Sequence, residues 1–193
     1  MAILDTYIDA LNENPLSVKI LTAFLQMAIA DFLVQQIENK SKKRPFGFDL
    51  QRWLTMVIYS CSVHVPIQHF YYVRIIEVYF SDSFTGVIAK TLFDQTVFSI
   101  FINVVGLFYS AVMNGKDFEK ACRHVWSTFW GVFKINLCFW PFITFIQFSF
   151  FSVHVGAAFN ILCCFIWFIF LTFYQNSVLS KPAIKVESKD KAE

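Results

Sequence analysis

Long runs without charged side chains alternate with short polar segments along this chain. A helical run of about 20 apolar residues is long enough to cross the roughly 30 Å hydrocarbon core of a bilayer. The pattern predicts four membrane-spanning helices, at about 16–37, 53–73, 87–113 and 153–174. The segments between them predict loops, one of which carries the basic sequence KSKKR.

The region after the third predicted span has a different pattern. Aromatic and aliphatic residues recur on one helical face at 117–133 and charged residues on the other, which predicts an amphipathic helix lying in the membrane interface. The next 46 residues, 135–180, contain no Asp, Glu, Lys or Arg. Because Pro141 lies early in that run, we expect a bent, partly re-entrant segment at 135–151, with a fifth span as the alternative.

The two ends of the chain differ from the apolar middle. Apolar residues at helical spacing before Pro15 predict a short N-terminal interfacial helix that ends there. Residues 181–193 form a polar tail without an apolar face. The sequence therefore predicts an all-α membrane protein, with one transmembrane domain over 1–180 followed by the tail.

Composition supports a membrane location and excludes several classes of function. Of the 193 residues, 56% are hydrophobic, 16% are charged and 25 are Phe, and the mean hydropathy is +0.53. Soluble domains contain about 45–50% apolar and about 25% charged residues. We therefore expect membrane lipids as partners and no nucleic acid, since the net charge is only +2.

Recognisable catalytic motifs are absent from the sequence. It contains no glycine-rich phosphate loop, no HExxH or GxSxG motif, and its five cysteines include no CxxC pair. The four histidines have no spacing that requires a metal or haem, so satisfied polar groups are the simpler interpretation. We expect no enzyme activity, no cofactor and no metal site.

Polar side chains inside the predicted spans are the candidate functional groups. Each is costly in a bilayer unless it is paired or hydrated. They can line an aqueous path through the bundle, or they can form interhelical hydrogen bonds that fix its packing. The candidates are Asp31, Gln35, Arg52, His64, His69, Lys90, Asp94, Gln95, Asn103 and Gln147.

Two pairings are expected among these candidates. Asp31, near the end of the first span, and Arg52, at the start of the second, should lie on the same side of the membrane and pair. Lys90 and Asp94 are four residues apart and can pair within one helix, with His69 on the same side.

Several short motifs occur in order from about Tyr7 to Tyr174, and on them the chain resembles the Mpv17/PMP22 family. The resemblance implies small four-span, non-enzymatic proteins of the mitochondrial inner membrane and the peroxisome, regarded as channel-like. Two glycines and an arginine of the family pattern are replaced here, by Ala30, Val65 and Gly156. The matching residues are Tyr7, Leu11, Pro15, Asp31, Gln35, Gln36, Arg52, Pro66, His69, Tyr72, Asp94, Gln95, Trp140, Pro141, Phe148 and Trp167.

Two hypotheses follow for function. The first is a channel-like protein of the mitochondrial inner membrane, or alternatively of the peroxisome, whose path is narrow or closed at rest and is bridged midway by His64, Asn103 and Gln147. The second is a structural accessory subunit of a larger inner-membrane complex, of the respiratory chain or ATP synthase type, which packs its Phe-rich exterior against other subunits and lipid.

Overall fold

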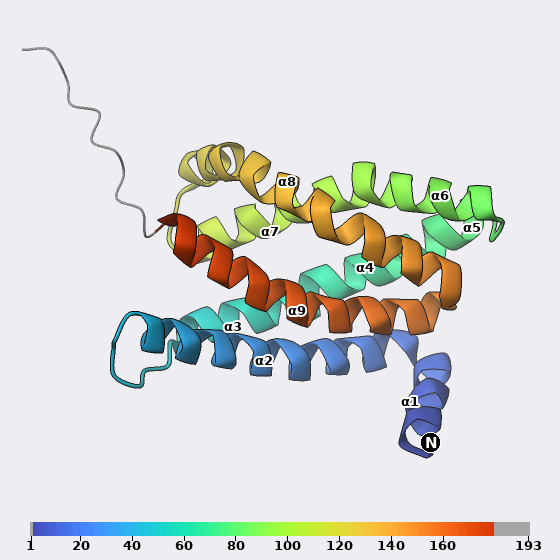
Figure 1. Ribbon diagram of the computed structural model, residues 1–193, viewed down its shortest axis with the longest axis horizontal. Helices are drawn as coiled ribbons and strands as arrows, with labels where there is room; N and C mark the ends of the chain where they lie inside the picture. The colour runs from blue at the N-terminus through green and yellow to red at the C-terminus, as the bar shows by residue number, and fades with distance from the viewer. Residues whose placement is uncertain (1, 180–193) are drawn as a thin grey trace, which may run out of the picture.

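The computed structural model describes residues 2–179, and over them it is all-helical, without a strand (Figure 1). Five long helical runs pack side by side in alternating directions, and the short α1 lies across one end of them. The all-α prediction is therefore confirmed for the described residues. The predicted tail at 181–193 lies outside them.

The first two helices meet at Asn14. α1 (Ala2–Glu13) ends before Pro15, which occupies the first turn of α2 (Pro15–Ser41), as the sequence predicts. The Tyr7 hydroxyl lies 3.0 Å from Thr22 Oγ1, and this contact holds α1 against α2. The interfacial placement of α1 stays a prediction.

The second run is one continuous helical path from residue 50 to residue 79, longer at both ends than the predicted 53–73. Pro66 has no N–H to donate to the preceding turn, and the helix widens into a π segment just before it. The expected polar connection from residue 74 is wrong, because the helix continues to Tyr79. The parts are α3 (Leu50–Tyr59), π-helical η1 (Ser60–His64), α4 (Val65–Tyr71), π-helical η2 (Tyr72–Ile76) and α5 (Glu77–Tyr79).

The third run contains the predicted span at 87–113. The Ser83 side chain accepts a hydrogen bond from the Gly86 N–H and so caps its first turn. The run ends at Met113, and Gly115 takes the left-handed backbone conformation, with φ +77°, that turns the chain toward α8. Its parts are α6 (Phe84–Phe93), π-helical η3 (Asp94–Phe98) and α7 (Ser99–Met113).

The fourth run differs from the expectation. A single helix, α8 (Phe118–Phe150), replaces the separate interfacial helix at 117–133 and the re-entrant segment at 135–151. Of the apolar stripe predicted to face the membrane interface, Phe129 and Phe133 are buried in the bundle, whereas Phe118, Trp126 and Trp130 are exposed. Pro141 removes one backbone donor without ending the helix, which membrane helices tolerate.

The last helix, α9 (Val153–Leu179), packs against α2 and α8 and contains the predicted span at 153–174. Among the described residues, three helical segments are long and apolar enough to cross a membrane, at Pro15–Ser41, Phe84–Met113 and Phe118–Phe150. The protein is therefore a membrane protein by this criterion. The predicted count of four spans is not confirmed.

Polar side chains lie inside the bundle and large apolar ones lie outside. Leu21, Leu25 and Ile29 of α2 are about half exposed, whereas Asp31 on the same helix is fully buried. Lipid accepts such an apolar exterior, and the interior then becomes the polar part of the molecule. Among the described residues, the buried polar set includes Lys19, Gln68, Lys90, Asp94, Gln95, Asn136, Thr144, Gln147 and Asn160.

We predict that all five helical runs cross the membrane. In a variant with its five native cysteines replaced by Ser, single cysteines at Lys43 and Asn114 should react with an impermeant maleimide from one side. Cysteines at Tyr79 and Ser152 should react from the opposite side, because the runs alternate in direction. Labelling of Ser152→Cys from the same side as Lys43→Cys would contradict five crossings and restore the re-entrant segment.

Candidate functional site

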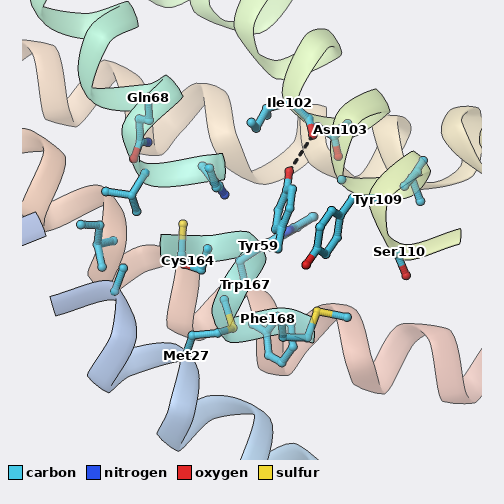
Figure 2. A pocket seen from close by; sticks show the side chains of 18 of the residues that line it. Met27, Tyr59, Gln68, Ile102, Asn103, Tyr109, Ser110, Cys164, Trp167 and Phe168 are labelled. Carbon is cyan, nitrogen blue, oxygen red and sulfur yellow. Dashed lines mark hydrogen bonds between the residues drawn. The ribbon is translucent and has the colours of Figure 1, made fainter. Parts of the chain in front are cut away.

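The bundle contains a cavity of about 600 Å³ whose lining combines apolar and polar side chains. Its walls come from α2, the run from α3 to η2, the run from η3 to α7, α8 and α9 (Figure 2). Its polar lining includes Glu38, Asp49, Gln51, Arg52, Thr55, Tyr59, Ser60, His64, Gln68, Tyr72, Asp94, Gln95, Ser99, Asn103, Tyr109, Ser110, Asn114, Asn136, Thr144 and Asn160.

The cavity has a mouth at one end of the bundle. Asp49, which precedes α3, and Asn114, which follows α7, belong to the lining and are both exposed. Glu38 and Arg52 line the same end. Solvent on this side of the membrane therefore has access to the cavity between the ends of α2, α3 and α7.

A buried ion-pair network holds the mouth together. Arg52 Nε donates to Asp31 Oδ1 at 3.1 Å, and Arg52 Nη1 donates to Glu38 Oε2 at 3.0 Å. Gln35 Nε2 donates to Asp31 Oδ2 at 2.7 Å, and Gln35 Oε1 accepts from the Asp49 N–H at 2.6 Å. The predicted Asp31–Arg52 pair is confirmed. It fastens α2 to α3, with Arg52 in the lining of the cavity and Asp31 behind it.

The middle of the cavity is narrowed by two tyrosines. The Tyr59 hydroxyl donates to the Ile102 carbonyl at 3.2 Å, and its ring lies 5.0 Å from that of Tyr109 (Figure 2). A side chain at Gly106 would bring Cβ to within 2.9 Å of the Tyr59 hydroxyl, so glycine allows this close approach. His64 and Asn103, predicted to bridge the middle, both belong to the lining.

The inner end of the cavity is a layer of hydrogen-bonded amides. Gln68 Nε2 donates to Asn160 Oδ1, and Asn160 Nδ2 donates to Gln147 Oε1, both at 2.9 Å. Gln147 was expected to bridge the path, but it lies behind Asn160 and outside the lining. This relay joins α4, α9 and α8 across the inner end.

A second set of bonds joins η3 and α7 to α8 in the same layer. Gln95 Nε2 donates to Asp94 Oδ2 at 2.9 Å and to Thr144 Oγ1 at 3.3 Å. Asn136 Nδ2 donates to Ser99 Oγ at 3.1 Å. The predicted candidates Asp94 and Gln95 therefore face the cavity from one π segment.

Below this layer the cavity is closed by a hydrophobic floor, which we define as Tyr71, Tyr72, Ile76 and Phe98. The rings of Tyr71 and Phe98 stack with centroids 4.5 Å apart. Tyr72 and Phe98 also line the cavity. The floor therefore separates the cavity from the opposite face of the bundle.

Lys90 and His69 lie beyond the floor and do not line the cavity. Lys90 Nζ pairs with Asp82 at 2.5 Å and lies 3.9 Å from Glu77, so the predicted Lys90–Asp94 pair is wrong. Helical side chains lean toward the N-terminus, which directs Lys90 to the loop before α6 and away from Asp94.

His69 takes part in a separate contact on the same side of the floor. The buried Lys19 Nζ lies 3.3 Å from His69 Nδ1. The His69 ring stacks with that of His154, with centroids 6.4 Å apart. This contact joins α2, α4 and α9 at the end of the bundle opposite the mouth.

Comparison with known proteins points to the same family as the short sequence motifs. Residues 111–172, from the end of α7 into α9, match the model of the Mpv17 / PMP22 family. PXMP2/4 family protein 4 of Dictyostelium discoideum is 25% identical over 174 residues, which are 89% of this chain and 92% of that protein. The chain is similar to the Mpv17/PMP22 family along most of its length.

Further relatives come from two kinds of membrane. Peroxisomal membrane protein 2 of Bos taurus is 26% identical over 87% of each chain. Mitochondrial inner membrane protein Mpv17 of Caenorhabditis briggsae is 21% identical over 96% of this chain and all of that protein. No solved structure matches.

Several of the residues that carry the family resemblance line the cavity or its floor. Trp140 and Trp167 both line it, and their rings are 5.9 Å apart. Phe148 packs edge-on against Tyr72 of the floor at 5.7 Å. Pro66 follows the η1 segment that supplies His64. Part of the resemblance to the Mpv17/PMP22 family therefore lies around the cavity.

Sequence reasoning missed part of the lining. Asn136, Thr144 and Asn160 are polar residues within the long charge-free run. Their place in an apolar run indicates side chains that face the interior of the bundle. Tyr59 and Gln68 gave no such signal, since tyrosine and glutamine also occur at membrane surfaces. No group of three His, Cys, Asp or Glu residues in the described chain is placed to hold a metal ion.

We expect Arg52→Leu to destabilise the protein more than Asp31→Leu. Losing Arg52 leaves the fully buried Asp31 with Gln35 alone, whereas losing Asp31 leaves Arg52 its bond to Glu38. Breaking a buried pair costs about 3–5 kcal/mol, and Arg52 keeps 30% of its side chain exposed, so we expect about 3 kcal/mol for Arg52→Leu.

Thermal unfolding of the detergent-solubilised variants measures this difference. Arg123→Leu is the matched control, because its pair with Glu119 lies on the surface and both side chains are largely exposed. Equal midpoints for Arg52→Leu and Arg123→Leu would show that the buried network contributes nothing to stability.

Proposed function

We propose that this protein is channel-like and gives small polar solutes a path across an organellar membrane. The observation that carries the proposal is the cavity of about 600 Å³, open at the mouth between α2, α3 and α7 and closed by the hydrophobic floor. Channel-like function is also what the family resemblance implies. The described conformation corresponds to the closed state.

Packing energetics favour this interpretation over a purely structural interior. Protein interiors are close-packed, and buried polar groups are costly unless they are hydrogen-bonded or hydrated. A helix bundle that served only as a scaffold in lipid gains nothing from a cavity of this size. In a solvated path, water satisfies the polar groups that line the cavity.

The floor is built on segments suited to move. Tyr72 and Ile76 lie on η2, and Phe98 lies on η3. π segments break the regular hydrogen-bond pattern of a helix and occur frequently at functional sites. A return of η2 or η3 to α-helical geometry rotates the residues beyond it by part of a turn, which would withdraw a ring from the floor.

The proposed location rests on the membranes for which the relatives are named. We infer the mitochondrial inner membrane, with the peroxisomal membrane as the alternative, because relatives named for each are found. We propose that the protein is not an enzyme. The alternative role, as an accessory subunit of a larger inner-membrane complex, predicts a protein that co-purifies with other subunits and leaves liposomes tight.

We expect Ser110→Trp to lower solute flux at least fivefold, because Ser110 lines the cavity close to its mouth and an indole there fills the entrance. The measurement is efflux of a small labelled solute from liposomes that contain the purified protein. The matched control is Ser127→Trp, which places the same side chain on the exposed face of α8.

The two roles give different results in this experiment. A channel-like protein gives flux above that of empty liposomes, lowered by Ser110→Trp and unchanged by Ser127→Trp. The proposal would be contradicted if liposomes that contain the unmodified protein release no more solute than empty liposomes. Equal flux through the two variants would also contradict it.

A further inference from the structure

A groove lies on the outer face of the bundle, between the second and third helical runs. It has a volume of about 530 Å³, and nine of its ten lining residues are aliphatic or aromatic. Its back wall is formed by the buried rings of Tyr71 and Phe98, which also belong to the hydrophobic floor. Phe70 and Phe101, each about half exposed, lie at its opening. The groove is therefore on the lipid side of the floor, and the cavity is on the other side.

The tenth lining residue is Arg74, an exposed cation. With the described residues it forms no ion pair and no hydrogen bond. Glu77, three residues further on, lies 3.9 Å from Lys90 Nζ instead, and Asp82 also pairs with Lys90. Arginine stays charged and binds phosphate through two parallel N–H groups. One end of an apolar groove therefore presents an anion-binding group that the described chain leaves open.

The groove runs lengthwise between two antiparallel helical runs. The ring of Tyr71 lies 6.3 Å from that of Phe93, which sets the register of the two runs at this point. Arg74 therefore lies at the end of the groove near Phe93, and Pro66 lies at the end near Phe101. The end that carries Arg74 is directed to the face of the bundle opposite the mouth.

The length of the groove matches one lipid leaflet. The second run, from residue 50 to residue 79, rises about 45 Å, which is the thickness of a bilayer with its headgroups. Set upright in a bilayer, this run places Pro66 close to the centre and Arg74 about 14 Å from it. The hydrocarbon core of one leaflet is about 15 Å thick. The apolar walls thus follow one leaflet, and Arg74 lies at the level where the phosphates begin.

We propose that the groove binds one anionic phospholipid from the leaflet opposite the mouth, with an acyl chain along its apolar walls and the phosphate at Arg74. The inference rests on the prediction that the second run crosses the membrane. It goes beyond the proposed path, because the groove lies on the outside of the bundle. An acyl chain there packs on Tyr71 and Phe98 from the lipid side and gains dispersion contacts that an unfilled groove lacks.

Charge distinguishes the lipids that can fill the groove. Phosphatidylglycerol carries one net negative charge, whereas phosphatidylcholine carries the same phosphate together with a quaternary ammonium. Arg74 attracts the first headgroup and repels the ammonium of the second. One basic side chain near the membrane surface is worth about fivefold in affinity for an acidic lipid. The groove should therefore prefer phosphatidylglycerol about fivefold when both lipids carry the same chains.

Native mass spectrometry of the purified full-length protein in detergent tests this, because it counts bound lipids and gives their apparent Kd. The probes are phosphatidylglycerol and phosphatidylcholine, each with one palmitoyl and one oleoyl chain. We expect the unmodified protein to bind its first phosphatidylglycerol about fivefold more tightly than its first phosphatidylcholine.

Two pairs of variants, all at exposed positions, locate the site. Arg74→Gln should reduce the preference for phosphatidylglycerol to less than about twofold, whereas Arg123→Gln, which removes the same charge from α8, should leave it unchanged. Val97→Trp fills the groove and should weaken the binding of both lipids at least fivefold. Leu92→Trp, on the same helical run but outside the lining, is its matched control. Circular dichroism verifies that each variant is folded.

Several results would overturn the proposal. They are equal Kd values of the two lipids for the unmodified protein, an unchanged preference in Arg74→Gln, or equal binding by Val97→Trp and Leu92→Trp. A dimer that Val97→Trp abolishes would also overturn it, because a second copy of the chain would then occupy the groove. The liposome experiment separates this site from the proposed function. Lipid selectivity without solute flux retains the site and removes the channel, and flux without lipid selectivity does the reverse.

Discussion

The cost of placing polar groups against lipid determines how this molecule is arranged. An unpaired charge or amide in the hydrocarbon core costs several kcal/mol, so polar side chains turn inward and the Phe-rich faces turn outward. Asp31, fully buried on a helix whose other face carries exposed leucines, illustrates both halves of this rule. Its pair with Arg52 fastens α2 to α3 and so fixes one edge of the mouth.

The inward polar groups are used in two ways. Some satisfy one another across helices, as Gln68, Asn160 and Gln147 do, and thereby hold α4, α8 and α9 together. Others, such as Gln95 and Asn136, bond on one side and keep a buried oxygen that accepts no hydrogen bond within the described chain. The hydrophobic floor below this layer, carried by π segments, sets whether the path is closed.

Much of this arrangement follows from the sequence, and the exceptions have physical causes. The Asp31–Arg52 pair and the break at Pro15 follow from local spacing and from which helix ends share a side. The continuity of α8 does not, because an amphipathic pattern at 117–133 fits the first half of a longer helix as well as a separate helix in the membrane interface. The partner of Lys90 depends on a loop carboxylate, Asp82, that helical spacing does not reveal. π segments have no signature in hydrophobic periodicity, so the floor could not be predicted.

Thiol accessibility in native membranes tests the central claim that the interior is hydrated from one side only. Asn103→Cys, in a cysteine-free background, lies on the cavity wall, whereas Ile100→Cys on the same helix is on the exposed outer face. A small charged methanethiosulfonate reagent should modify Asn103→Cys from the side of the mouth, and leave it unmodified from the opposite side. Ile100→Cys should stay unmodified from both. Equal modification of Asn103→Cys from both sides, or none from either, would contradict a cavity that is open at the mouth and closed by the floor.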